Sequence, residues 1–138
     1  MAKITLDQLK KLNACGSQRD LFEHTYGSEA EVTEEACRKA AYFFHWSWIA
    51  GRTLSETLYS EYCRVARKAR YDRDTRLGAV LVEKTTQPQL SVLGDTADNI
   101  AKRRAAWNNF DETLATTFAR LYNEEHGDGT NNRKHSEV

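Results

Sequence analysis

The sequence predicts an all-α protein, with a compact N-terminal unit of short helices at residues 4–52 and a long antiparallel helical hairpin at 53–126. Three observations predict this fold class. One proline and seven glycines among 138 residues leave long stretches free of helix breakers. Residues that cap helix starts recur along the chain, and apolar residues recur at steps of three and four. A chain of this length suits a single core.

The N-terminal unit is predicted to begin with two short helices. Thr5 and Gln8 have the spacing of a capping box, in which each side chain accepts a hydrogen bond from the other residue's backbone N–H. This box predicts a first helix at about residues 6–14, which Gly16 ends. A second helix then continues until Gly27.

Thr33 is the next predicted N-cap, and the helical run that follows it to Ile49 is rich in aromatic residues that need burial. Trp46 and Trp48 cannot share one helix face, because residues two apart point about 200° from one another. Trp48 lies four residues after Phe44, so we predict Trp48 in the core. Trp46 is then predicted to lie on the surface and to anchor a partner.

The first long helix of the hairpin is predicted to begin at a second capping box, formed by Thr53 and Glu56, and to continue to about Val82. Its apolar positions step by four, three and four, at Leu58, Tyr62, Val65 and Ala69. At about 1.5 Å per residue, each of the two long helices would extend roughly 45 Å.

The second long helix carries a stricter pattern, which we call the predicted seam: Leu93, Ala97, Ile100, Arg104, Trp107, Asp111, Leu114, Phe118 and Leu121. Arg104 and Asp111 are charged, and a charge in a buried seam costs desolvation unless it is paired. Arg73 and Arg76 lie opposite in an antiparallel hairpin. We therefore predict that Asp111 pairs with one of these two arginines.

The connection between the long helices has two interpretations. Residues 85–88 can close a helical turn, whereas the valine- and leucine-rich segments 79–83 and 90–93 can pair as a small β-hairpin at the tip. After His126 the sequence is polar, with one aliphatic residue, so residues 127–138 are predicted to be disordered.

The first long helix also carries a basic segment: Arg64, Arg67, Lys68, Arg70, Arg73 and Arg76. Residues three apart differ by 300° around a helix, so these arginines wind around it and do not form one stripe. We consider three interpretations of this basic segment and favour the first, a solvated or internally paired surface. Contact with an acidic protein ranks second, and contact with nucleic acid ranks third. The predicted partner-binding residues are Arg64, Arg67, Lys68, Arg70 and Trp46.

Composition excludes several functional classes. Lysine and arginine total 20, as do aspartate and glutamate, so the chain lacks the net charge of a non-specific nucleic-acid binder. No apolar run reaches the roughly 18 residues that a membrane span needs, and the start has no apolar signal segment. We expect a cytoplasmic protein with no membrane partner.

No pattern indicates a metal, a cofactor or a catalytic site. Cys15 with His24, and Cys37 with His45, are spaced too widely for a zinc knuckle. The odd count of three cysteines, with Cys63, favours reduced thiols, and no histidine is placed to activate one. Phosphate-binding and hydrolase motifs are absent from the sequence. We therefore expect no cofactor and no enzymatic activity.

Four segments resemble the start of a class of small bacteriophage and prophage proteins: LKKLNACGSQ at 9–18, Leu21-Phe22, Glu31-Val32-Thr33, and Phe44-His45-Trp46-Ser47-Trp48. Those proteins carry an Ala-Cys-x-x-Gln-x-x-x-Phe element, a Val-Thr helix start and a Trp-containing segment. The resemblance covers about residues 6–55 and implies a phage origin. It transfers no catalytic residue, because the group has no assigned enzymatic activity.

These features predict a non-catalytic interaction protein, a phage accessory factor that binds and modulates a host macromolecule in the bacterial cytoplasm. A host protein is the preferred partner. The alternative is a nucleic-acid-binding protein that uses the arginine-rich segment 64–76. The sequence is also compatible with a homo-oligomer.

Overall fold

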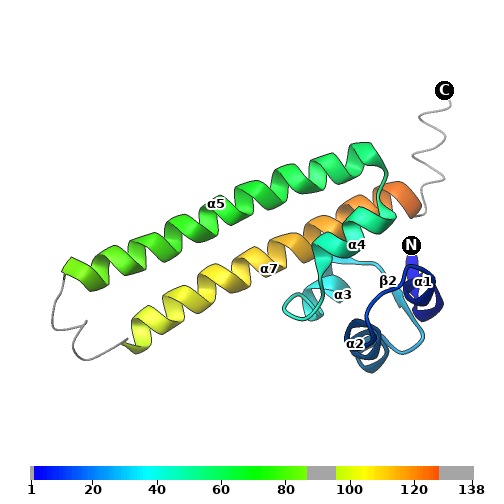
Figure 1. Ribbon diagram of the computed structural model, residues 1–138, viewed down its shortest axis with the longest axis horizontal. Helices are drawn as coiled ribbons and strands as arrows, with labels where there is room; N and C mark the ends of the chain where they lie inside the picture. The colour runs from blue at the N-terminus through cyan, green and yellow to red at the C-terminus, as the bar shows by residue number, and fades with distance from the viewer. Residues whose placement is uncertain (1, 87–95, 128–138) are drawn as a thin grey trace.

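The computed structural model describes residues 2–86 and 96–127, and it confirms the predicted all-α architecture and the helical hairpin. The long helices α5 (Glu56–Thr86) and α7 (Ala97–His126) pack against each other along the length of the molecule (Figure 1). The short elements gather beside the C-terminal half of α7. One half of the hairpin therefore projects beyond the N-terminal unit.

The N-terminal unit contains four helices and two short strands. Two predicted caps are confirmed: Thr5 and Gln8 form a capping box, and the Thr33 side chain accepts a hydrogen bond from the Ala36 N–H at 2.9 Å. The elements are β1 (Lys3–Thr5), α1 (Leu6–Lys11), α2 (Gly16–Tyr26), β2 (Glu29–Glu31), α3 (Glu34–Lys39) and α4 (Trp46–Thr53).

The two strands, which the sequence analysis did not predict, join the chain start to the C-terminal part of α7. β1 and β2 pair antiparallel, with Ile4 opposite Ala30. The Tyr122 hydroxyl of α7 donates a hydrogen bond to the Lys3 carbonyl at 3.1 Å, and the Asn123 side chain accepts one from the Ala2 N–H at 3.2 Å. The sheet therefore holds the N-terminal unit against α7.

The aromatic run after Thr33 is two helices, where one was predicted. α3 ends at Lys39, and α4 begins at Trp46. Tight turns fill the interval, with the Phe43 N–H bonded to the Ala40 carbonyl at 3.1 Å. Because this break places Phe44 outside any helix, its four-residue spacing to Trp48 carries no helical meaning.

The predicted capping box at Thr53 is wrong. Thr53 is the last residue of α4, and its hydroxyl donates to the Ile49 carbonyl at 2.7 Å. Ser55 instead precedes α5, where its carbonyl accepts a hydrogen bond from the Tyr59 N–H at 2.7 Å. The long helix therefore begins at Glu56, three residues after the predicted start of the hairpin.

The alternative of a small β-hairpin at the tip is wrong for its first strand, because residues 79–83 lie within helix α5. Its second strand, at 90–93, falls outside the described residues. The predicted disordered tail also lies outside them, apart from Gly127, the C-cap of α7.

One hydrophobic core extends through the N-terminal unit and the adjoining part of the hairpin, which is the N-terminal part of α5 and the C-terminal part of α7. Phe118 of α7 is 1% exposed, and its ring centroid lies 5.7 Å from that of Trp46 on α4. Tyr62 of α5 is also buried, and its hydroxyl shares a 3.0 Å hydrogen bond with Ser47 of α4. α7 is therefore packed on one side by α5 and on another by the N-terminal unit.

Candidate interaction surface

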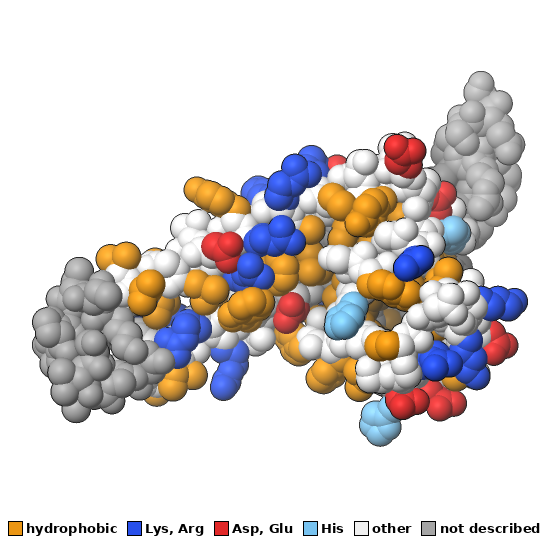
Figure 2. Space-filling model, viewed as in Figure 1, with side chains coloured by type: hydrophobic (Ala, Val, Ile, Leu, Met, Phe, Trp, Pro, Cys, Tyr) orange, Lys and Arg blue, Asp and Glu red, His pale blue; other side chains and the backbone are white. Residues whose placement is uncertain are grey.

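The projecting half of the hairpin is strongly basic, although the chain as a whole is neutral. We call residues 64–82 of α5 and 97–111 of α7 the distal arm. The distal arm holds nine basic and four acidic residues, whereas residues 2–63 and 112–127, the base, hold eight basic and twelve acidic residues. On the face shown in Figure 2, lysine and arginine side chains lie along the hairpin. The molecule is therefore polarised along its long axis.

The outer face of α5 carries a row of exposed residues at helical spacing. Arg64, Arg67, Lys68 and Tyr71 follow the i, i+3, i+4, i+7 pattern of one helix face, and Tyr71 is 71% exposed. Arg64 is neutralised by a two-pronged contact with Glu61, with both N–O distances at 2.7 Å. Among the described residues no acidic group lies within 4 Å of Arg67, Lys68 or the exposed Arg70. These three charges are available to a partner.

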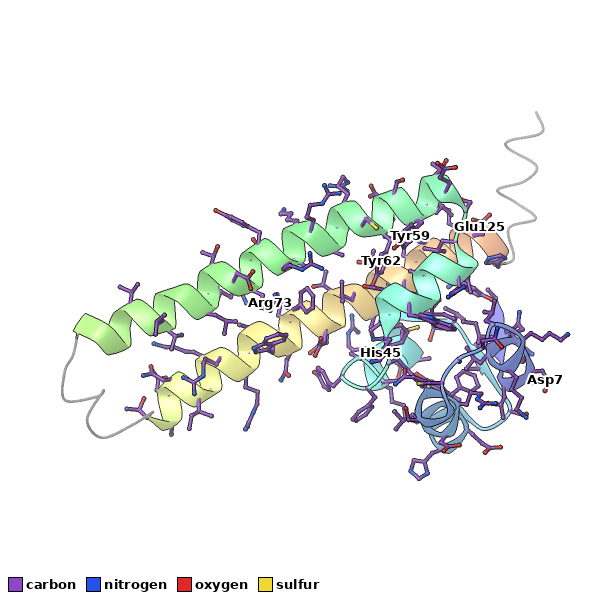
Figure 3. All side chains as sticks on the ribbon, in the orientation of Figure 1. Asp7, His45, Tyr59, Tyr62, Arg73 and Glu125 are labelled. Carbon is purple, nitrogen blue, oxygen red and sulfur yellow. The ribbon has the colours of Figure 1, made fainter. Side chains whose placement is uncertain are left out.

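Arg73 has a different environment, because its side chain turns between the two long helices (Figure 3). Its guanidinium lies 4.3 Å from the Trp107 ring centroid and 4.4 Å from that of Phe110, and its Nε contacts Asp74 at 3.0 Å. Cation–π contacts of this kind stabilise a half-buried charge. Arg73 therefore holds the two helices of the arm together and presents little charge to solvent.

Asp111 of α7 is half-buried, and its carboxyl group feels the positive charge of Arg73. Burial raises the pKa of Asp111, and the positive charge of Arg73 opposes that rise. Arg76 and Arg104, the other residues of the predicted polar seam, are exposed. The charge of Arg73 thus acts on Asp111, but among the described residues neither Arg73 nor Arg76 forms an ion pair with Asp111 within 4 Å, so the predicted pair does not form.

The predicted seam divides at Asp111. Leu114, Phe118 and Leu121 are buried, but Ile100 is 41% exposed and Trp107 is 46% exposed. The reason is that the N-terminal unit covers only the base of α7, where Tyr42 and Arg38 contact Glu112. In the arm, the residues of α7 buried instead are one position away from the predicted seam: Asn99, Ala106 and Phe110.

The prediction that Trp46 is a surface anchor is wrong. Trp46 is 6% exposed, and its indole N–H donates to the Ala41 carbonyl at 3.0 Å. Trp48, predicted to be in the core, is half-buried, with the Arg52 guanidinium 5.4 Å from its ring centroid. The exposed tryptophan of the molecule is Trp107, which the sequence analysis placed in the seam.

The cysteines lie in three different environments, and the described residues contain no cluster of three or more metal-ligating side chains. Cys15 is exposed at the start of α2, and a 3.3 Å hydrogen bond with the Ser17 hydroxyl lowers the pKa of its thiol. Burial raises the pKa of Cys37 to about 12. Cys63 is half-buried.

Cys15 should therefore react with a thiol reagent at pH 8 at least about tenfold faster than Cys37, since the thiolate is the reactive form and Cys37 keeps its proton. Timed alkylation followed by peptide mass spectrometry measures each rate. Unfolding in guanidinium should abolish the difference. Equal rates in the folded protein would mean that Cys37 is accessible.

No protein family, curated protein or solved structure matches this chain. In the described part of the chain, none of the helices combines the length and apolarity that membrane crossing requires. The resemblance to small phage proteins stays a prediction. The interpretation of the surface therefore depends on the positions, exposure and charges of its residues.

Proposed function

We propose that this protein is a non-catalytic interaction protein, a phage accessory factor whose distal arm docks on an acidic surface of a host protein. The separation of charge along the molecule carries this proposal: the arm has an excess of five positive charges, and the base an excess of four negative charges. Such a distribution orients the arm toward an acidic partner and keeps the base away from it.

The apolar residues of the arm favour a protein partner. Trp107 and Ile100 lie exposed on α7, and Leu81 is exposed on α5. Tryptophan and arginine are the residues enriched at the energetic centres of protein interfaces. A basic surface with exposed aliphatic and indole groups complements an acidic protein surface that also has apolar positions, more closely than it complements a phosphate backbone.

Nucleic acid is the second candidate, and the exposed Tyr71 beside Arg67 and Lys68 favours it, because aromatic rings among basic side chains stack on bases. The outer face of α5 offers one such ring. Binding to DNA or RNA that weakens steeply as salt rises would support this candidate over the protein partner.

Reversing two arm charges, Arg67→Glu with Arg70→Glu, should weaken partner capture by about tenfold or more, since both side chains are exposed and unpaired within the described structure. Quantitative mass spectrometry of proteins captured from nuclease-treated bacterial lysate measures this effect. The helix content should not change, because exposed substitutions alter stability by less than about 0.5 kcal/mol.

A matched control makes the same change of charge on the base. Lys10 and Lys11 are exposed on α1, and Lys10→Glu with Lys11→Glu should leave capture within about twofold of the original protein. Capture that survives reversal of the arm charges, or that falls equally in both variants, would exclude the arm as the docking surface.

A further inference from the structure

The N-terminal unit encloses an apolar cavity that has no role in the proposed interaction. The cavity has a volume of about 60 Å³ and is partly open to solvent. It lies where α2, α3, α4 and α7 meet, and its walls include Phe22, Val32, Cys37, Trp46 and Phe118. Of all the lining residues, His45 and Glu31 are exposed, and Figure 3 labels His45 just before α4.

The walls of the cavity are held by contacts that fix their shape. The Trp46 ring is tied by its bond to the Ala41 carbonyl and packs against Phe44 and Phe118, each with 5.7 Å between ring centroids. Gln18 joins α2 to the turn before α4, donating to the Phe43 carbonyl at 3.2 Å and accepting from the His45 N–H at 3.1 Å. A ligand would therefore meet a preformed site.

The buried polar groups among the walls are already satisfied or neutral, and the one carboxylate of the lining, that of Glu31, is exposed. The Tyr26 hydroxyl donates to the Ala36 carbonyl, and burial keeps the Cys37 thiol protonated at neutral pH. The volume corresponds to roughly four water molecules, but water needs two to four polar partners, and apolar cavities of sufficient size stay dry and accept apolar molecules. Well-packed cores contain few voids of this size.

We propose that this cavity is a binding site for a small, uncharged, apolar molecule of no more than about four non-hydrogen atoms, since its volume corresponds to roughly four water molecules. Aromatic walls supply dispersion contacts to a short hydrocarbon chain or a noble-gas atom. An anionic ligand is disfavoured, since the lining contains the Glu31 carboxylate and no lysine or arginine that could pair with a negative charge.

The isoleucines of this chain give a direct test with xenon, a small apolar atom, as the probe. There are three of them, of which Ile4 and Ile49 line the cavity and Ile100 lies exposed on the distal arm. In protein with ¹³C-labelled isoleucine methyl groups, xenon should shift the Ile4 or Ile49 signal in a saturable way and leave the Ile100 signal in place. No saturable shift, or an equal shift at Ile100, would overturn the proposal.

Two further measurements test the location and chemistry of the site. Ala36→Leu fills the cavity from α3 and should weaken xenon binding at least about tenfold, whereas Ala101→Leu on the exposed face of α7 should not. Acetate, a small anion, should give no saturable shift of the Ile4 or Ile49 signal in the unchanged protein. A saturable acetate shift at either residue would overturn the proposal even if Ala36→Leu does not fold.

Discussion

Replacing Phe118 with alanine should lower the free energy of unfolding by about 3–5 kcal/mol, the range for large aromatic deletions in a core. Phe118 lies where α7 meets the N-terminal unit, with Trp46 at 5.7 Å and Tyr122 at 5.3 Å between ring centroids. Removing the ring loses the free energy of burying its apolar surface. It also leaves a cavity, because the neighbouring rings are held in place by other contacts. Leu114→Ala should cost about 2–5 kcal/mol for the same reason.

Ile100→Ala is the matched control, since Ile100 belongs to the same predicted seam but is 41% exposed. Its loss should change stability by less than about 0.5 kcal/mol. Urea melts of the three variants measure these differences. If Phe118→Ala were as mild as Ile100→Ala, α7 would not be packed by the N-terminal unit as the structure places it.

The elements that could be predicted from the sequence are those decided by short-range bonds. The Thr5–Gln8 capping box and the Thr33 cap are contacts between residues three apart, so the local sequence determines them. The hairpin could be predicted because two long stretches without breakers both repeat at helical spacing. Ser55 and Thr53 show the limit, since both residue types can cap a helix and tertiary packing selects Ser55.

The break between α3 and α4 could not be predicted, because distant residues hold it. Gln18 bonds the backbone of Phe43 and His45 from more than twenty positions away along the chain. No proline or glycine marks the interval, so the sequence looks like one continuous helix. The wrong prediction that Trp46 lies on the surface followed from this break, because residues on either side of a turn do not share a helix face.

The candidate surface could be predicted only in part. The basic segment is visible in the sequence, and its charges do wind around α5: Arg67 faces outward, Arg73 lies between the helices and Arg76 is on another exposed side. The sequence does not show where the N-terminal unit stops covering α7. That limit, at Glu112, decides that Trp107 is exposed and Phe118 is buried, although both belong to one seam.

Trp46→Ala should also cost about 3–5 kcal/mol of unfolding free energy, because the indole is 6% exposed and contacts the rings of Phe44 and Phe118. Trp46→Phe keeps part of the burial but leaves the Ala41 carbonyl without its donor, so it should cost less than alanine and more than zero. Tyr71→Ala, at a ring that is 71% exposed on α5, supplies the control for loss of a surface aromatic side chain.

A double-mutant cycle between Trp46 and Phe118 then tests whether the two rings form one cluster. Because each ring forms part of the other's packing surface, the double variant should lose less stability than the two single changes added together, by about 0.5–3 kcal/mol. Additive losses would place the two rings in independent surroundings. If Trp46→Ala proved as mild as Tyr71→Ala, Trp46 would be a surface residue after all, and the aromatic wall of the cavity would not exist.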